Sequence, residues 1–380
     1  MKNKKLLMIP GPSPVARSIQ DQMGRETVAF GDPDFVRDFR DLLLDLRTLW
    51  KTDGEVFVVA GSGTLAMEMA IANTTKRGQR VLVVSHGFFG DRFVEICKRK
   101  GLEVVVLASE WGKAQGVAEI EKALRKNPYN VVTVTHVDTS TGVCAPVPEI
   151  GTMMKQFPAT LLIVDGVCAT AAEPEQVDDM GIDILFTGSQ KAFGVAPGLA
   201  MLWAGQKAMK RRSELGVIPE YYADFDKWLP IMHDPSKYFA TPAVNLVWAL
   251  KESVRIIKEE GLEARYARHR RNAKAIQSAL EAIGFSILAE EHVRAVTLSG
   301  VLYPGGIDDV RFRTTLAQEG VQVAGGLGAY AGKMFRLGHM GNIDEHDLVS
   351  VVAAIERTLA AVGRKHDIGS GVTELMKKLH

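Results

Sequence analysis

Seven short apolar runs alternate with helix-length segments in the first half of the chain. Each run is a near-continuous stretch dominated by Val, Ile and Leu, which is typical of strands buried on both faces. Strands separated by helices need crossover connections, so we expect a mostly parallel sheet with helices on both faces and an α/β fold. The runs are residues 56–60, 80–85, 103–108, 131–136, 160–165, 183–188 and 199–204.

The sequence changes character after this region. A long helical stretch over 243–282 has a strongly charged middle, which suits a solvated helix that links two domains. From about residue 284, short strand-like runs and a final helix predict a smaller α+β domain. We expect four parts: an N-terminal arm (1–20), a large domain (21–255), a small C-terminal domain (256–365) and a peripheral tail (366–380).

Composition narrows the class of protein. The 380 residues carry a net charge of +1, which gives no attraction to nucleic acid or to an anionic membrane. No apolar run approaches the length of a membrane span, and the apolar part of the N-terminal segment is too short for a signal peptide. Three scattered cysteines predict a reducing, cytoplasmic setting, and nine unclustered histidines predict no metal site.

The loops after the predicted strands hold the residues that could bind a ligand or take part in catalysis. Ligands of open parallel sheets bind beyond the carboxyl ends of the strands. Four groups follow these ends: a Gly-Ser-Gly-Thr turn (61–64), Phe89, Asp165 and Lys191. Taken singly, each has an ordinary interpretation: a helix cap, a core aromatic, a turn cap and a lysine that reaches solvent.

Together these groups predict one cofactor. A lysine is rarely buried without a partner, whereas a lysine amine in an apolar pocket can form a Schiff base. The cofactor that needs such a lysine, a carboxylate for a protonated pyridine nitrogen and a phosphate site is pyridoxal 5′-phosphate (PLP). The turn at 61–64 supplies backbone N–H groups at a helix N-terminus, which favour an anion. Phe89 would stack on the pyridine ring.

At these residues the chain resembles a known family, the class V aminotransferases of PLP fold type I, and in particular the alanine–glyoxylate and serine–pyruvate enzymes. The resemblance spans residues 10 to about 362 and implies a large domain with a seven-stranded, mostly parallel sheet and a smaller C-terminal α+β domain. The motifs that carry it occur in the family's order: PGPSPV, GSGTLAMEMA, HGFFGDR, THVDTSTGV, LLIVDGV, DILFTGSQKAFGVAPG, YFATPA and GKMFRLGHMG.

The resemblance also implies roles in holding the cofactor. Lys191 would form the Schiff base, and Asp165 would pair with the pyridinium nitrogen. Val167 and Phe89 would pack on the ring, and Thr139 would lie near its hydroxyl group. Relatives often carry Trp where Phe89 stands and His where Thr64 stands. The implied phosphate ligands are Ser62, Gly63, Thr64 and Gln190, with Tyr238 and Thr241 reaching across from a second subunit of a homodimer.

On the substrate side, the resemblance implies that Arg336 binds the α-carboxylate through its planar fork. The segment around Phe30 and Gly31 would line the substrate entrance, and here the chain departs from the pattern of many relatives. Small residues and a single candidate arginine favour a short, uncharged donor side chain.

The predicted activity is transamination from alanine or serine to glyoxylate or pyruvate. Three alternatives remain open within the sequence. The first is another donor, such as aspartate or 2-aminoethylphosphonate. The second is a PLP lyase of the cysteine desulfurase type, although such enzymes place His before the lysine where this chain has Gln190. The third is a non-catalytic subunit of a soluble hydrogenase, for which we find no cluster-binding residues.

Overall fold

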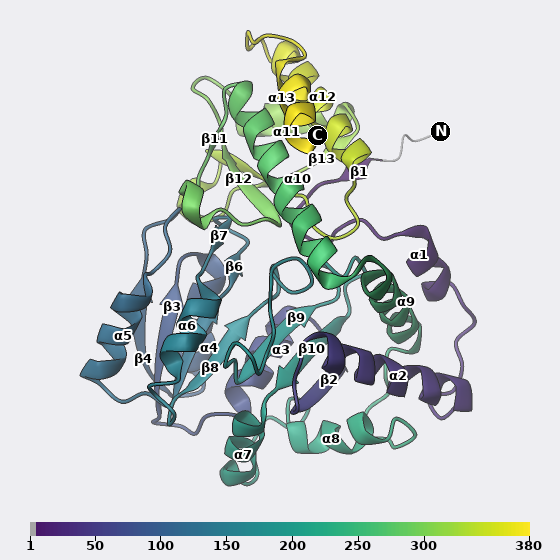
Figure 1. Cartoon of the computed structure of the whole chain (residues 1–380), viewed down its shortest axis with the longest axis vertical. Helices are drawn as coiled ribbons and strands as arrows, with labels where there is room; N and C mark the ends of the chain where they lie inside the picture. The colour runs from purple at the N-terminus through teal and green to yellow at the C-terminus, as the bar shows by residue number, and fades with distance from the viewer. Residues whose placement is uncertain (1–4) are drawn as a thin grey trace.

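A seven-stranded sheet forms the centre of the larger part of the molecule (Figure 1). The structure, a computed structural model, describes residues 5–380, so the first four residues of the expected arm lie outside it. The strand order is β2-β10-β9-β8-β5-β3-β4, in which β10 is antiparallel to both neighbours and the other pairs are parallel. All seven apolar runs form strands: β2 (Glu55–Ala60), β3 (Arg80–Ser85), β4 (Glu103–Ala108), β5 (Val131–Thr135), β8 (Leu161–Asp165), β9 (Ile184–Gly188) and β10 (Leu199–Ala204).

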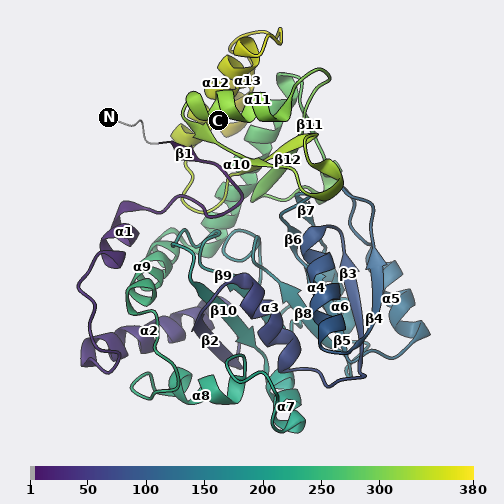
Figure 2. The same ribbon diagram turned by 180° about the vertical axis from the view of Figure 1, so that it is seen from behind.

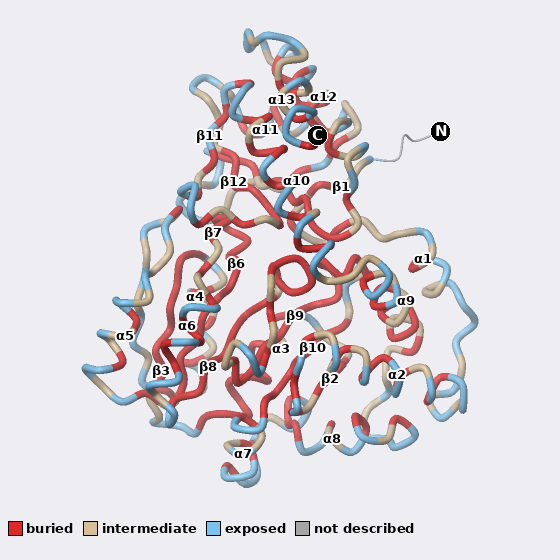
Figure 3. The backbone as a smooth tube through the Cα atoms, in the orientation of Figure 1, coloured by how far each residue is buried: buried red, intermediate tan, exposed pale blue. Residues whose placement is uncertain are grey.

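Helices cover both faces of this sheet, as the crossover pattern predicts. Helices α3 and α4 pack on one face, seen in Figure 2, and α6 packs on β8 on the other face. The strands are buried along most of their length, except for the edge strand β4 (Figure 3). The helices of this part are α1 (Arg17–Met23), α2 (Pro33–Leu49), α3 (Gly63–Ala72), α4 (Phe88–Arg99), α5 (Val117–Lys126), α6 (Val147–Met154), α7 (Gln206–Leu215), α8 (Phe225–His233) and α9 (Val244–Glu260).

A smaller sheet and its helices form a second hydrophobic core above the first (Figure 1). Its antiparallel strand order is β11-β12-β15-β14, and the short β1 (Leu6–Leu7) joins this part by pairing with β13 (Val321–Gln322). A hairpin of β6 (Val137–Asp138) and β7 (Val143–Cys144) follows β5. The remaining elements are α10 (Leu262–Ala282), β11 (Ser286–Ile287), β12 (Leu298–Leu302), α11 (Asp309–Gln318), β14 (Ala324–Gly325), β15 (Met334–Gly338), α12 (Glu345–Ala361) and α13 (Ser370–Leu379).

The long helical stretch expected over 243–282 is two helices, and its charged middle is exposed apart from a few residues such as Arg265. Gly261 has φ +78°, a left-handed conformation that favours glycine, and it ends α9 and begins α10. Arg265 is only 1% exposed because its guanidinium donates to the carbonyls of Ala171 and Ala192 and pairs with Glu260. Arg265 therefore binds the main chain of the larger part, whereas Arg255, Lys258 and Arg271 of the same stretch are exposed.

The C-terminal segment differs from the expected peripheral tail. Residues 370–379 form α13, which packs against α10 and α12. Leu375 is fully buried in the second core, and the Glu356 carboxylate accepts hydrogen bonds from the backbone N–H groups of Gly369 and Gly371. The Gly/Ser break seen in the sequence is therefore the turn before a packed helix. The other expected domain boundaries stay predictions.

Among the helices described, none combines the length and the apolar character needed to cross a bilayer.

Candidate active site

The carboxyl ends of the central strands and the N-terminus of α3 meet around one cavity of about 200 Å³. This placement follows from the parallel pairing of β5, β8 and β9, which brings their ends to the same edge of the sheet. Most of the cofactor-site residues predicted from the sequence line it. The lining residues are Ser62, Gly63, Thr64, Met67, Phe89, Arg92, Val137, Thr139, Asp165, Val167, Gln190 and Lys191.

Lys191 is buried beside the N-terminal segment. It follows β9 by three residues, is 8% exposed, and its Nζ donates a hydrogen bond to the carbonyl oxygen of Pro10. Gly11 has φ +111°, and a Cβ placed there would lie 2.5–2.7 Å from the Cδ, Cε and Nζ atoms of Lys191. The PGPSPV motif therefore packs directly on the lysine, and only glycine fits at position 11.

Asp165 ends β8 as a buried carboxylate that forms no ion pair with any residue of the described range 5–380. It is 3% exposed, and its Oδ1 accepts a hydrogen bond of 2.9 Å from the Val167 backbone N–H. Burial raises the pKa of Asp165 to about 7, although the Val167 hydrogen bond and the charge of Lys191 oppose this rise. A protonated ring nitrogen in the cavity would remove this cost by pairing with the carboxylate.

The N-terminus of α3 is open to an anion. The N-cap residue, Ser62, makes no side-chain capping hydrogen bond, and the first turn holds no acidic residue. Gly63 lies against Val167, because a Cβ at position 63 would come within 2.8 Å of the Val167 Cγ2 atom. The free N–H groups and the partial positive charge of the helix end favour a phosphate here. The buried Oε1 atom of Gln190 also has no hydrogen-bond partner among the described residues.

The first turn of α4, which carries Phe89, is held by Asp138. One carboxylate oxygen of Asp138 accepts hydrogen bonds from the backbone N–H groups of Phe89 (3.0 Å) and Gly90 (3.1 Å). The next residue, Thr139, lines the cavity, and its hydroxyl lies 2.7 Å from the Cys168 sulfur. Asp138 therefore positions both the aromatic ring and the loop around Thr139.

Five predicted residues lie outside this cavity. Arg336 on β15 is adjacent to it, because its Nη1 donates to the Thr139 carbonyl (3.3 Å) and its Nε donates to the Gly325 carbonyl (2.8 Å). Phe30 and Tyr238 contact each other, with ring centroids 5.0 Å apart, and Tyr238 is 62% exposed. The other two residues, Gly31 and Thr241, are exposed.

Sequence reasoning missed Met67 and Val137, which line the cavity. It also missed three residues whose contacts hold the site: Gly11, Arg92 and Asp138. Each stands in a quoted motif, PGPSPV, HGFFGDR or THVDTSTGV. Arg92 follows Phe89 by one helical turn, a spacing that places both side chains on one face of α4. The contacts of Gly11 and Asp138 join segments far apart in the sequence, so no local pattern signals them.

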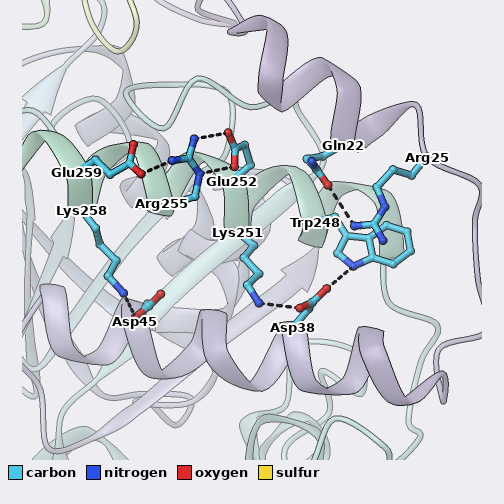
Figure 4. Close-up of a pocket in the computed structure, with 10 residues that line it drawn as sticks. All are labelled: Gln22, Arg25, Asp38, Asp45, Trp248, Lys251, Glu252, Arg255, Lys258 and Glu259. Carbon is cyan, nitrogen blue, oxygen red and sulfur yellow. Dashed lines mark hydrogen bonds and ion pairs between the residues drawn. The ribbon is translucent and has the colours of Figure 1, made fainter.

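Another cavity, of about 460 Å³, lies between α1, α2 and α9 (Figure 4). Its charged residues already pair with one another: Lys251 binds Asp38 at 2.7 Å, and Lys258 binds Asp45 at 2.6 Å. The Arg25 guanidinium stacks over the Trp248 ring at 3.7 Å. This cavity has no buried lysine, so it does not have the groups that a PLP site needs.

The cavity lined by Lys191 and Asp165 has the groups that a PLP site needs. A buried lysine amine, a buried carboxylate without a cation, an aromatic ring and an open helix N-terminus surround one space at the edge of a parallel sheet. The fold and the site thus define an enzyme of the PLP-dependent type.

Comparison with known proteins identifies the family. Residues 45–341 match the class V aminotransferase family. An uncharacterized aminotransferase of Methanocaldococcus jannaschii is 37% identical over 95% of this chain and 94% of its own. The serine–glyoxylate aminotransferase of Hyphomicrobium methylovorum is 33% identical (96% and 92%), and the small subunit of a soluble hydrogenase of Synechococcus sp. is 32% identical (96% and 95%).

A solved structure supports the same family assignment. The alanine–glyoxylate aminotransferase of Nostoc sp. superposes with a TM-score of 0.90 at 31% identity, over 94% of this chain and 96% of that one. The chain belongs to the class V aminotransferase family. It is a transaminase that uses PLP, and the resemblance noted in the sequence is confirmed.

We expect Gly11→Ala to slow covalent attachment of the cofactor to Lys191. The added Cβ displaces the lysine side chain, and an L residue is strained by about 1–2 kcal/mol at this φ, so the rate should fall roughly tenfold or more. The change in absorbance after PLP is added to the apoprotein measures that rate. Gly305→Ala is the matched control, because a Cβ there has open space. A Gly11→Ala protein that reacts as fast as wild type would contradict the contact.

Asp165→Asn should change how the stability of the apoprotein depends on pH. The pKa of Asp165 is about 7 in the folded chain and about 4 in the unfolded chain, so the folded state keeps its proton while the unfolded state loses it. Wild-type stability therefore falls as pH rises from about 4 to 7, by up to about 4 kcal/mol at 1.36 kcal/mol per unit.

The Asp165→Asn variant has no carboxyl group at this position, so its stability should not fall in this way as pH rises from about 4 to 7. It should be more stable than wild type at pH 8 and similar to it near pH 4, as measured by urea denaturation of both apoproteins. A stability difference that does not vary with pH would show that Asp165 has an ordinary pKa.

Proposed function

We propose that the chain transfers the amino group of a small amino acid, alanine or serine, to glyoxylate or pyruvate. The observation that carries the proposal is a buried lysine, Lys191, in one cavity with a buried carboxylate, Asp165, and an open helix N-terminus. The names of the relatives, serine–glyoxylate and alanine–glyoxylate aminotransferase, support the choice of donor and acceptor.

The residues around the cavity divide into three groups by role. Bound PLP supplies an electron sink for the carbanion formed when the substrate Cα loses its proton. Asp165 would hold the ring nitrogen protonated, which its burial and its lack of an ion pair within residues 5–380 favour. Phe89 and Val167 would pack on the ring, and Thr139 would lie beside its hydroxyl group. The proposed phosphate ligands within this chain are Ser62, Gly63, Thr64 and Gln190.

Lys191 moves the proton in the proposed reaction. Once the amino group of the substrate has taken its place, the freed Nζ would accept the proton from the substrate Cα and would deliver it to the cofactor carbon bonded to the same nitrogen. The Pro10 carbonyl, which accepts a hydrogen bond from this amine, gives it a fixed position beside the cavity.

Arg336 binds the substrate carboxylate in this proposal. Its guanidinium is half-buried, it forms no ion pair with an acidic side chain among the described residues, and burial lowers its pKa from the usual value. Its Nε and Nη1 atoms donate hydrogen bonds to two carbonyl oxygens, which fix the plane of the guanidinium group beside Thr139. A substrate carboxylate would supply the missing counter-charge.

The donor side chain would be short. Phe30 and Gly31 line the proposed entrance, and no atom lies within 4 Å of a Cβ placed on Gly31. A second arginine that could bind the distal carboxylate of a longer donor was not predicted from the sequence.

The active unit is proposed to be a homodimer with shared sites. Tyr238 and Thr241 do not line the cavity of their own chain, and both are exposed. The residue after Tyr238, Phe239, contacts a second exposed tyrosine, Tyr221, with ring centroids 5.3 Å apart. A two-fold interface that covers these side chains could bring Tyr238 and Thr241 of one chain to the phosphate site of the other.

A desulfurase activity is less well supported, because Cys97 and Cys168 are buried and Cys144 lines a different cavity.

We place the enzyme in the cytoplasm, a proposal supported by three cysteines that form no disulfide within residues 5–380.

A half-reaction with single amino acids tests the activity. Alanine or serine should bleach the absorbance of the bound cofactor faster than aspartate or 2-aminoethylphosphonate, and alanine and serine should each yield the corresponding 2-oxo acid. Lys191→Ala should neither attach the cofactor covalently nor react. A faster reaction with aspartate would contradict the proposed donor, and turnover by Lys191→Ala would contradict the assignment of the lysine.

Mixing two inactive variants tests the shared site. One variant is Lys191→Ala, and the other combines Tyr238→Phe with Thr241→Ala. A mixed dimer has one site with both lesions and one site with neither, so random exchange of subunits should restore about a quarter of the wild-type activity. No recovery, although exchange is shown by mass spectrometry of the dimers, would mean that each chain holds its cofactor alone.

A further inference from the structure

Arg92 is a cation of the cavity with no role in the reaction as described. It lies on α4 one turn after Phe89 and lines the same cavity as Thr64 and Lys191. Among the described residues it forms no ion pair with a carboxylate. Its Nη1 donates a hydrogen bond of 2.9 Å to the Thr64 hydroxyl oxygen.

The aromatic rings fix this guanidinium in place. The Cζ atom of Arg92 lies 4.8 Å from the centroid of the Phe89 ring and 5.6 Å from that of Phe88. Since Asp138 holds the main chain of Phe89, the arginine rests on a ring whose position is itself constrained. Cation–π contacts of this kind stabilise an arginine in one orientation.

The hydrogen bond from Arg92 determines what Thr64 can offer to the cavity. A hydroxyl group has one donor and accepts through its lone pairs, and here Arg92 occupies an acceptor position. No other hydrogen bond of the Thr64 hydroxyl is formed within the described chain, so its proton is free to point at an acceptor in the cavity. A guanidinium behind the oxygen polarises the O–H group and strengthens the bond that it donates.

We propose that Arg92 is a positioning residue that makes the site selective for the phosphorylated form of the cofactor. It acts through Thr64: it orients the hydroxyl proton toward the phosphate and adds positive charge beside the open N-terminus of α3. The inference rests on the proposed placement of the phosphate at Ser62, Gly63 and Thr64. It explains how a threonine can serve at a position where relatives often carry histidine, since the cation comes from the neighbouring helix.

Titration of the apoprotein with PLP and with unphosphorylated pyridoxal tests this role. Arg92→Met should weaken the affinity for PLP by about tenfold to a hundredfold, the range for one charge-assisted hydrogen bond, and should leave the affinity for pyridoxal unchanged. Arg92→Lys should recover part of the loss, because it keeps the charge without the planar fork. Arg99→Met is the matched control, since Arg99 lies on the same helix, is exposed and pairs only with Glu95.

A second pair of variants tests the path through Thr64. Thr64→Val should itself reduce the preference for PLP, and Arg92→Met added to it should cause little further loss. Additive losses would overturn the role of Thr64. An equal loss of affinity for PLP and pyridoxal in Arg92→Met would overturn the proposal, because it would mean that the arginine only supports the packing of α4.

Failure of the proposed function has a different signature. If wild type neither attaches PLP at Lys191 nor reacts with amino acids, the site assignment is wrong whatever Arg92 does. If wild type does both and Arg92→Met keeps the full preference for PLP over pyridoxal, only the inference about Arg92 is wrong.

Discussion

Two buried ionisable groups, Lys191 and Asp165, line one cavity without forming an ion pair with each other. Burying a charge without a partner is costly, and the raised pKa of Asp165 is the visible sign of that cost. Other contacts of the site keep Lys191 and Asp165 buried and apart from a partner of opposite charge. In the proposed function a bound cofactor would relieve both, because it would attach covalently to Lys191 and would give the carboxylate of Asp165 a cationic partner.

The geometry of the two groups comes from the sheet. Strands β8 and β9 are parallel neighbours, with Asp165 in register with Phe186, so the carboxylate and the lysine loop emerge at the same edge. The N-terminal segment then closes over the lysine, because Pro10 and Gly11 contact its side chain while β1 pairs with β13 in the smaller part. One short segment thus connects the smaller sheet to the reactive amine of the larger one.

Local patterns in the sequence were sufficient for the strands of the large sheet and for the residues at their carboxyl ends. The apolar runs predict β2, β3, β4, β5, β8, β9 and β10 because a near-continuous apolar run can be recognised as a strand from its own residues. The break at Gly261 and the packing of α13 were missed because they depend on a single left-handed residue and on contacts with a distant core. Gly11 and Asp138 act through residues far away in the chain, so neither composition nor spacing marks them, whereas the spacing of Arg92 from Phe89 on α4 is a local signal that was overlooked.

The charges of the site connect binding to stability. Lys191 and Arg92 in the cavity and Arg336 beside it lack acidic partners among the described residues, whereas the one carboxylate of the cavity, Asp165, resists ionisation. Such an arrangement favours anions, and the phosphate and the substrate carboxylate bring the negative charge that the protein omits. A ligand that binds only the folded state stabilises it. In the proposed function the cofactor and the substrate, rather than acidic side chains of the protein, would supply the negative charge of the site and so stabilise the fold.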